Sequence, residues 1–487
     1  MGTFGFEDHD AGFVADYLDR FWSGPIAKHC AARPERRWHK TDDPSFASGS
    51  SFGDARSAAL QREVDAAVAH GQPAVIHLNG TYNFSRASLV LLGANQLTLQ
   101  GAPGTLLLFS VWRVRCTIIG TGGPCHGAAA ADDDPPGVDD CCATETCGPG
   151  TDCVNWSSGV NITSSVGVTV RRVAIDYDPR WVNAKQAATS LAARAGSGAA
   201  FNAGRLFTYH NFNSTETLTE DLRILHAPFM AITSLNGEGG HVFRRVEFVP
   251  KDAAGVAMVA SKDGVHESDV RRGMLLEDSS IHGTADDFFN FHTTLMITMR
   301  CESRSRCLMI NPHVNRSPRN TIYASNSVLE TVRAGDRMSF YPLNAHVSIA
   351  TATVRSLARV DDPALQAEAS DFANATAANA SNGVMSFADG PVDDLWRVEF
   401  ESELPSLIPP TALVNIDTIN GSGVVVRNNR FTRTNANCGR WKSSNGALLN
   451  NTFAFAKLRN LELGQTKTPP RRSKLGSTAP RPWKTKT

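Results

Sequence analysis

The fold is decided by two short stretches, SKDGVH at residues 261–266 and HGTADDFFNFH at residues 282–292. Asp263 in the first stretch lies 23 residues before Asp286 and 24 residues before Asp287 in the second. One coil of a right-handed parallel β-helix takes about that many residues, near the lower end of solenoid repeat lengths. A shift of one coil returns the chain to the same face, about 4.8 Å further along the axis. The spacing therefore predicts that acidic side chains of neighbouring coils project into one groove.

Carboxylates gathered on one surface are the groups that cleavage of a glycosidic bond requires. Asp286 and Asp287 are adjacent, and like charges so close disfavour joint ionisation, so one of them should keep a proton near neutral pH. We take these two and Asp263 as candidate catalytic residues. The alternative is that the Asp-Asp pair only makes turn and capping bonds, as Asp often does in loops. Nearby polar residues that could hydrogen-bond sugar hydroxyls are the candidate substrate-binding set: His266, His282, Asn290 and His292.

Short runs of β-branched residues recur along the chain and are bounded by Gly, Asn and Asp. Several share one pattern of apolar residues, a polar pair and a further apolar residue, as in VFRRV (242–246) and LLNNTF (448–453). Asparagine at a corner tolerates the left-handed backbone conformation and can stack from coil to coil. A β-sandwich would also give many short strands, but the near-constant spacing of similar phrases favours the solenoid.

The chain divides into five parts. Residues 1–48 are a lead-in of unknown role, and residues 49–334 form the β-helix, with a Cys-rich excursion at 116–153. The helix-like residues 55–69 would cap the open end of the first coil, as in pectate-lyase-like β-helices, which this start resembles. Alternating strands with an Ala/Asn/Ser-rich loop make residues 335–415 a small inserted antiparallel β-domain, a barrel or a sandwich. Residues 416–455 are the final coils, and the basic tail 456–487 should be disordered.

Composition excludes several classes of partner. The 48 basic residues balance the 48 acidic ones, so charge gives no general reason to expect nucleic acid or anionic membrane as a partner. No apolar run approaches the roughly 20 residues that span a bilayer. We therefore expect a soluble globular protein without a membrane span.

Cysteine usage points to an oxidising compartment. Six of the ten cysteines lie in the excursion. Because this stretch has little apolar periodicity and cannot pack a core of its own, we expect disulfides to stabilise it. A metal cluster with His126 is the alternative, but there is no CxxC pair and adjacent cysteines suit zinc poorly. Cys301 and Cys307 could close a further small loop, and Cys30 and Cys438 remain unassigned. The six are Cys116, Cys125, Cys141, Cys142, Cys147 and Cys153.

N-glycosylation sequons agree with a secreted or secretory-pathway protein, although the N-terminus shows no apolar signal region. They begin at Asn79, Asn83, Asn155, Asn161, Asn213, Asn374, Asn379, Asn420 and Asn450.

The central block of the chain resembles glycoside hydrolase family 110. The resemblance rests on DGVH (263–266), LEDS (276–279) and DDFFNFH (286–292), is supported by VAIDYDP (173–179) and VRNNRF (426–431), and spans roughly residues 52–453. Members of that family are right-handed β-helical enzymes that release terminal α-1,3-linked galactose with inversion. The resemblance implies a galactosyl glycan as substrate, no metal or other cofactor, Asp263 as general acid, and Asp286 or Asp287 as the source of the base.

Two departures from the family pattern bear on the substrate. Phe288 and Phe289 replace the family's usual small residues after the Asp-Asp pair and could narrow or reshape the sugar subsite. After Phe453 the similarity stops, so later coils that help to wall the family's pocket are missing or altered.

Two other classes of function stay open. A pectate-lyase-like polysaccharide lyase would need Ca²⁺ bound by both acids of the pair and a basic residue such as Arg271 or Arg272. A non-catalytic, carbohydrate-binding β-helix would bind glycans without turnover. Activity that survives a chelator would exclude the lyase.

Overall fold

The structure is a computed structural model of the 487-residue chain. It describes residues 52–463 except 86, 110, 118–125, 128–151, 157–158, 178–206, 228–229, 251–258, 261, 311–327, 343–346, 380–394, 435 and 457–460. The predicted lead-in at residues 1–48 lies outside this part of the chain.

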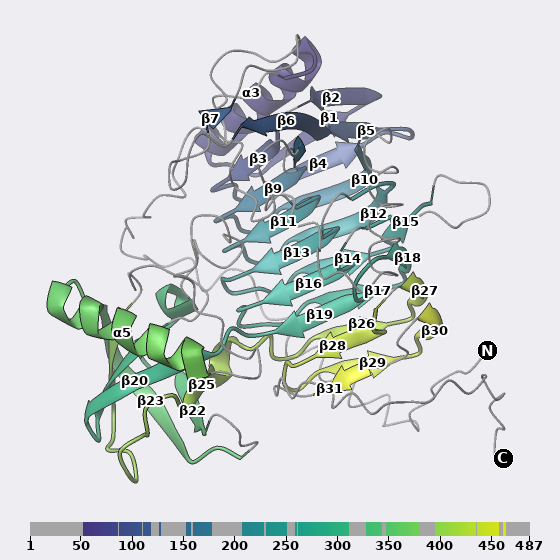
Figure 1. Ribbon diagram of the computed structural model, residues 1–487. Helices are drawn as coiled ribbons and strands as arrows, with labels where there is room; N and C mark the ends of the chain where they lie inside the picture. The colour runs from purple at the N-terminus through teal and green to yellow at the C-terminus, as the bar shows by residue number, and fades with distance from the viewer. Residues whose placement is uncertain are drawn as a thin grey trace, which may run out of the picture.

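Parallel strands form most of the molecule, and they stand in three rows (Figure 1). We call one passage of the chain through the three rows a coil, and the whole arrangement the stack. The first row consists of β1 (Ala74–Leu78), β4 (Leu97–Gly101), β10 (Thr169–Tyr177), β12 (Leu218–Ile224), β14 (Val242–Arg244), β17 (Leu275–Glu277), β26 (Val425–Arg427) and β29 (Ala447–Leu449).

The second row continues from the C-terminal halves of β10 and β12, which cross from one row into the next. Its other members are β2 (Thr81–Ser85), β5 (Leu106–Phe109), β15 (Glu247–Phe248), β18 (Ser280–Thr284), β27 (Arg430–Thr434) and β30 (Thr452–Ala456). The third row is a separate sheet of β3 (Leu89–Leu92), β9 (Val160–Thr163), β11 (Tyr209–Phe212), β13 (Ile232–Leu235), β16 (Val265–Ser268), β19 (Phe289–His292), β28 (Gly439–Trp441) and β31 (Leu461–Leu463).

These rows confirm the predicted mostly-β class with parallel sheets. They also extend past the predicted final coils, because β31 pairs with β28 inside the stretch that we expected to be a disordered tail. The backbone groups of β28 would otherwise end the third row unpaired, so β31 adds one more parallel partner.

The corner between the first and second rows is built alike in successive coils. One residue of each coil takes the left-handed conformation there: Arg172, Asp221, Arg245, Asp278, Asn428 and Asn450, with φ between 47° and 58°. The predicted stacking of asparagines is confirmed, because Asn450 Nδ2 donates to Asn428 Oδ1 at 2.9 Å. On the inner side of the same corner, Asn429 Nδ2 donates to Asn451 Oδ1 at 3.0 Å. The asparagine side chains thus form hydrogen bonds at the corner, where the backbone leaves the regular strand ladders.

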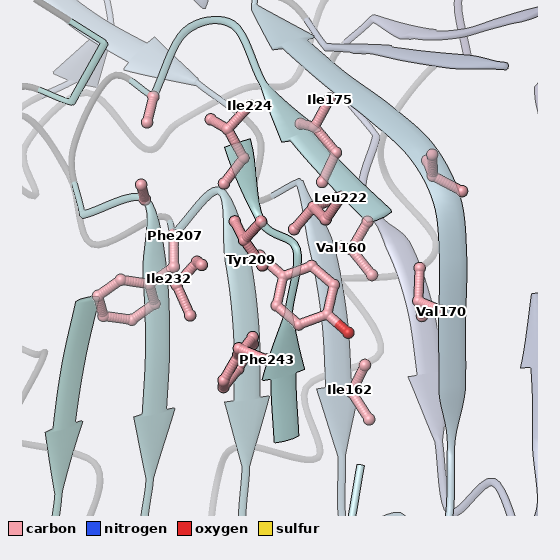
Figure 2. Packing of buried hydrophobic residues seen from close by; sticks show 14 of the residues in the cluster. Val160, Ile162, Val170, Ile175, Phe207, Tyr209, Leu222, Ile224, Ile232 and Phe243 are labelled. Atoms are coloured by element: carbon pink, nitrogen blue, oxygen red, sulfur yellow. The ribbon is translucent and has the colours of Figure 1, made fainter. Parts of the chain in front are cut away.

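The three rows enclose one apolar core. Figure 2 shows Tyr209 and Ile232 of the third row together with Leu222, Ile224 and Phe243 of the other rows, all in the same interior. Each fully buried side chain of this size contributes about 1.5–3 kcal/mol by leaving water. Helix α3 (Ala55–His70) covers the first coil as predicted, with Leu60 and Val64 packed into that core.

The Cys-rich excursion leaves the stack as a small antiparallel sheet. It comprises β7 (His126–Gly127), β6 (Val111–Thr117) and β8 (Asp152–Trp156), in that order across the sheet. The cysteine side chains of this excursion lie outside the described residues, and the predicted disulfides there stay a prediction.

The predicted insertion is a closed barrel of six antiparallel strands (Figure 1). Around the barrel the order is β20 (Met296–Ser303), β21 (Arg306–Ile310), β24 (Leu395–Phe400), β23 (Ala350–Arg359), β22 (Arg337–Tyr341) and β25 (Leu413–Ile416). It therefore begins about 40 residues before the expected boundary at 335, because β20 and β21 close the barrel instead of adding a coil. The expected pairing of Cys301 with Cys307 is confirmed. The disulfide joins the two antiparallel strands β20 and β21.

A helix packs on the barrel, and an ion pair joins the barrel to the stack. Helix α5 (Pro363–Asn379), formed by part of the stretch expected to be a loop, buries Ala369 and Ala373 against barrel residues such as Leu308. Between stack and barrel, Arg271 donates to both carboxylate oxygens of Asp336, at 2.6 and 2.8 Å. Short 3-10 turns, η2 (Val328–Thr331) and η3 (Asp417–Ile419), precede β22 and follow β25.

Candidate active site

Asp263 and Asp287 lie one coil apart, as the spacing predicts. Val265 of β16 is paired with Phe289 of β19, an offset of 24 residues. The Gly264 N–H donates to the Asp287 carbonyl at 3.0 Å, so the two aspartates enter the third row at equivalent positions. Both sit where the chain turns from the second row into the third.

The carboxylates of Asp263, Asp286 and Asp287 form one cluster. One oxygen atom of each lies within 4.8 Å of the others. They differ in access, however: Asp263 and Asp287 are buried, at 4% and 0% exposure, whereas the Asp286 side chain is 36% exposed. The spacing predicts acidic side chains that project into one groove, but Asp263 and Asp287 are buried. Asn437 and Arg440 of the next coil cover Asp287.

The cluster holds a proton near neutral pH. Burial, and then the neighbouring Asp263 carboxylate, raise the pKa of Asp287 to about 7, against the lowering effect of Arg440. The same two causes raise the pKa of Asp286 above its ordinary value. Like charges in a poorly hydrated place cannot all ionise at once, which is the behaviour we predicted for the adjacent pair.

Two cations offset the negative charge of the cluster. Arg440 Nε lies 3.0 Å from Asp287 Oδ2, an approach of charges without hydrogen-bond alignment. Lys262 Nζ lies 4.0 Å from Asp286 Oδ2. The backbone N–H of Asn437 donates to Asp287 Oδ1 at 3.0 Å. Sequence reasoning missed Arg440 and Asn437 because they follow the barrel, about 150 residues after the aspartates.

Two threonines hold the Asp286 backbone. Its carbonyl accepts hydrogen bonds from the hydroxyls of Thr284, at 2.8 Å, and Thr434. Thr284 and Thr434 are partners in the β18–β27 ladder, so two coils converge on this carbonyl. The exposed carboxyl therefore stands on a fixed piece of backbone.

Three of the four candidate substrate-binding residues gather beside Asp263. His266 Nδ1 lies 2.8 Å from Asp263 Oδ2, and Asn290 Nδ2 donates to the same oxygen at 3.3 Å. His292 Nε2 lies 3.0 Å from His266 Nε2. The fourth, His282, is on β18 in the second row, where its Nδ1 lies 2.8 Å from Thr432 Oγ1.

The phenylalanines after the Asp-Asp pair face the interior. Phe288, Phe289 and Phe291 are fully buried in the core of the stack, and the rings of Phe289 and Phe291 stack at 5.1 Å. Phe289 and Phe291, two residues apart on β19, both turn into the core, as strand alternation requires. The expectation that Phe288 and Phe289 narrow a sugar subsite is wrong, because the rings pack against Phe431 and Phe453 of the next coils.

Among the described residues, the aspartate cluster is the one group of carboxylate, imidazole and thiol side chains spaced to hold a metal ion. Lys262 and Arg440 already bring positive charge to it, which competes with a divalent cation for the same oxygens. Arg271 and Arg272, which a lyase would use, form ion pairs with Asp336 and Glu216 instead.

No protein-family model matches the chain. No curated protein matches it either. Within the described residues, no helix is long and apolar enough to cross a membrane.

Proposed function

We propose that the protein is an inverting exo-glycosidase that releases terminal α-linked galactose from glycans. The observation that carries the proposal is the cluster of three carboxylates from two adjacent coils, of which one is open to solvent. Carboxyl groups that share a proton at neutral pH supply both the acid and the base that glycoside hydrolysis needs. The galactosyl specificity rests on the resemblance to glycoside hydrolase family 110.

We also propose that the three rows are the faces of a right-handed parallel β-helix. Each coil passes through the rows in the same order, and every ladder within the rows is parallel. Secretion is part of the proposal and is supported by the Cys301–Cys307 disulfide, because disulfides persist in oxidising compartments.

Access to the substrate favours Asp286 as the proton donor. Its carboxyl is the exposed one, and its pKa is raised, so it can carry a proton to the departing glycosidic oxygen. Asp263 Oδ2 is instead engaged by Asn290 and His266. This assignment differs from the resemblance, which places the acid on Asp263.

Inversion is proposed from the resemblance, because the carboxylate oxygens, within 4.8 Å of one another, are closer than the roughly 6.5–9.5 Å that separates the carboxyl groups of inverting enzymes. A retaining enzyme needs a carboxylate that attacks the sugar itself, and buried carboxylates are poorly placed for that attack. A water molecule that hydrogen-bonds to both would span up to about 5.6 Å, which accommodates oxygens within 4.8 Å of each other. Asp263 and Asp287 would then activate this water while Asp286 protonates the leaving group.

The test compares Asp286→Asn with wild type on two substrates, an α-galactosyl disaccharide and an aryl α-galactoside with a good leaving group. We expect kcat on the disaccharide to fall by about 10²–10⁴-fold, and much less on the aryl substrate, which needs little protonation. Asp278→Asn is the matched control, since Asp278 is an exposed corner residue of the same coil.

NMR of the first-formed sugar should show β-galactose. Retained α-galactose would reject inversion, and full activity of Asp286→Asn on the disaccharide would reject the acid assignment. Cleavage of polyuronates that stops on addition of a chelator would replace the proposal with the lyase alternative. Glycan binding without turnover would replace it with the non-catalytic one.

A further inference from the structure

Three side chains beside the cluster are connected in series. Asp263 Oδ2 lies 2.8 Å from His266 Nδ1, and His266 Nε2 lies 3.0 Å from His292 Nε2. The two imidazole rings are perpendicular, at 89°, with centroids 4.9 Å apart. His266 is 1% exposed, and both of its ring nitrogens are used within the series. It therefore has no ring nitrogen left for a sugar hydroxyl.

The contact between the two histidines constrains their protons. Two ring nitrogens 3.0 Å apart have room for one hydrogen between them. When neutral His266 donates its Nδ1–H to Asp263, its Nε2 is bare and accepts. His292 must then be the tautomer that carries its hydrogen on Nε2. The tautomer of His292 thus determines whether His266 can donate to Asp263.

We propose that His292 is a positioning residue: acting through His266, it keeps Asp263 an oriented carboxylate that serves as a base. The catalytic part of this inference rests on the proposed function, whereas the tautomer assignment does not. A histidine that donates one N–H to a carboxylate and is held through its other nitrogen has a fixed ring orientation. Asp263 then presents its second oxygen in a constant direction.

Charged groups lie on one side of this series. Asp286 and Asp287 face Asp263 from the following coil. Arg440 lies on β28 opposite Asn290, and Trp441 beside it packs against Phe291. Lys442 follows the end of β28. On the other side of His266, the partner in β13 is Thr233, which does not titrate.

The test uses protein labelled with ¹⁵N at its 14 histidines, whose nitrogen shifts report tautomers directly. In wild type we expect His266 as the Nδ1–H form and His292 as the Nε2–H form. His292→Phe should release His266 into a mixture of tautomers, and His292→Gln should restore the Nδ1–H form, because an amide can donate to Nε2. His77→Gln, an exposed position on β1, is the control.

Activity gives the second measurement. Without its positioned donor, Asp263 should no longer present its second oxygen in a constant direction, so His292→Phe should slow the chemical step. We expect kcat to fall about 10–100-fold, the loss typical of partners that orient a catalytic group. KM should change little, and His292→Gln should recover most of the loss.

The outcomes separate the two proposals. The Nε2–H form of His266 in wild type would overturn the positioning role even if galactosides are cleaved. An unchanged His266 tautomer together with an unchanged kcat in His292→Phe would overturn it as well. The expected tautomers without any glycoside cleavage would support the positioning of Asp263 and reject the glycosidase.

Discussion

Arg440 Nε lies 3.0 Å from Asp287 Oδ2, so the coil that follows the barrel supplies the counter-charge for a carboxylate that precedes it. The pairing crosses 153 positions of sequence but only one step of the third row, where Asn290 is paired with Arg440. The aspartate cluster therefore gains this counter-charge only after the chain has left the stack, built the barrel and returned.

Arg440→Met should raise the pKa of Asp287 above its value of about 7 in wild type, because Arg440 is the cation that lowers it. The acidic limb of any activity that requires ionised Asp287 should move to higher pH accordingly. Carboxyl ¹³C NMR of Asp-labelled protein measures this pKa, and Asp287→Asn assigns the signal. Arg430→Met, at an exposed position on neighbouring β27, should leave the titration where it is. A lower pKa in Arg440→Met would contradict the electrostatic role of the ion pair.

Glu267→Gln should stabilise the protein at alkaline pH. Burial raises the pKa of Glu267 well above its ordinary value, although Oε1 accepts from the Met274 N–H. A carboxyl whose folded pKa is raised stabilises fully below its unfolded pKa and loses that contribution as pH rises through the folded pKa. The loss is about 1.4 kcal/mol for each unit by which the two pKa values differ.

Denaturant midpoints at pH 5 and pH 8 measure the effect of Glu267→Gln. Wild type should lose more stability between the two pH values than the variant, which has nothing to ionise. Glu247→Gln, in an exposed pair with Arg223, is the control and should behave as wild type. If wild type and Glu267→Gln lose the same stability between pH 5 and pH 8, the buried carboxyl is not the source of the pH dependence.

Arg271→Ala should loosen the attachment of the barrel. Arg271 and Asp336 are nearly buried and joined by two hydrogen bonds, and loss of one partner of a buried pair costs about 3–5 kcal/mol. Arg306→Ala, which breaks an exposed pair with Glu399, should cost about 0–1 kcal/mol. Unfolding midpoints followed by near-UV circular dichroism compare the stability of the two variants. Equal losses of stability would show that the buried ion pair contributes no more than the exposed one.

Glycans should appear at exposed sequons and not at buried ones. Asn79 and Asn450 are exposed, whereas Asn420 is buried and accepts from the Ser444 hydroxyl at 3.0 Å. In protein secreted by a eukaryotic host, we expect occupancy at Asn79 and Asn450 and none at Asn420, since a glycan there would displace the packed side chain. Peptide mass spectrometry after enzymatic deglycosylation measures each position. An occupied Asn420 in folded protein would contradict this placement.

The spacing of Asp263 and Asp287 was predictable because parallel ladders fix register: a 24-residue offset repeats through β16 and β19 without a slip. That Phe289 and Phe291 share a side follows from strand alternation, since residues two apart on a strand point the same way. The corner asparagines were likewise predictable from their local tolerance of the left-handed conformation.

The burial of Asp287 was not predictable from local sequence, because the groups that cover it come from the coil after the barrel. A signal for them did exist: Asp278 and Asn428 occupy equivalent corners, 150 residues apart, and the same offset leads from Asp287 to Asn437. The early start of the barrel was also hidden. The alternation of apolar and polar residues in β20 and β21 fits strands of a coil as well as strands of a hairpin. Only the pairing of β20 with β25 and of β21 with β24 shows that they belong to the barrel.

The position of the barrel has a consequence for synthesis. The 132 residues from Thr293 to Val424 leave the ribosome between β19 and β26. At typical elongation rates of about 5–20 residues per second, this takes roughly 7–26 s. Throughout that interval β17, β18 and β19 are the last strands of their rows, and their outer edges can pair with other chains. The nascent protein should therefore depend on chaperones most strongly at this stage of translation.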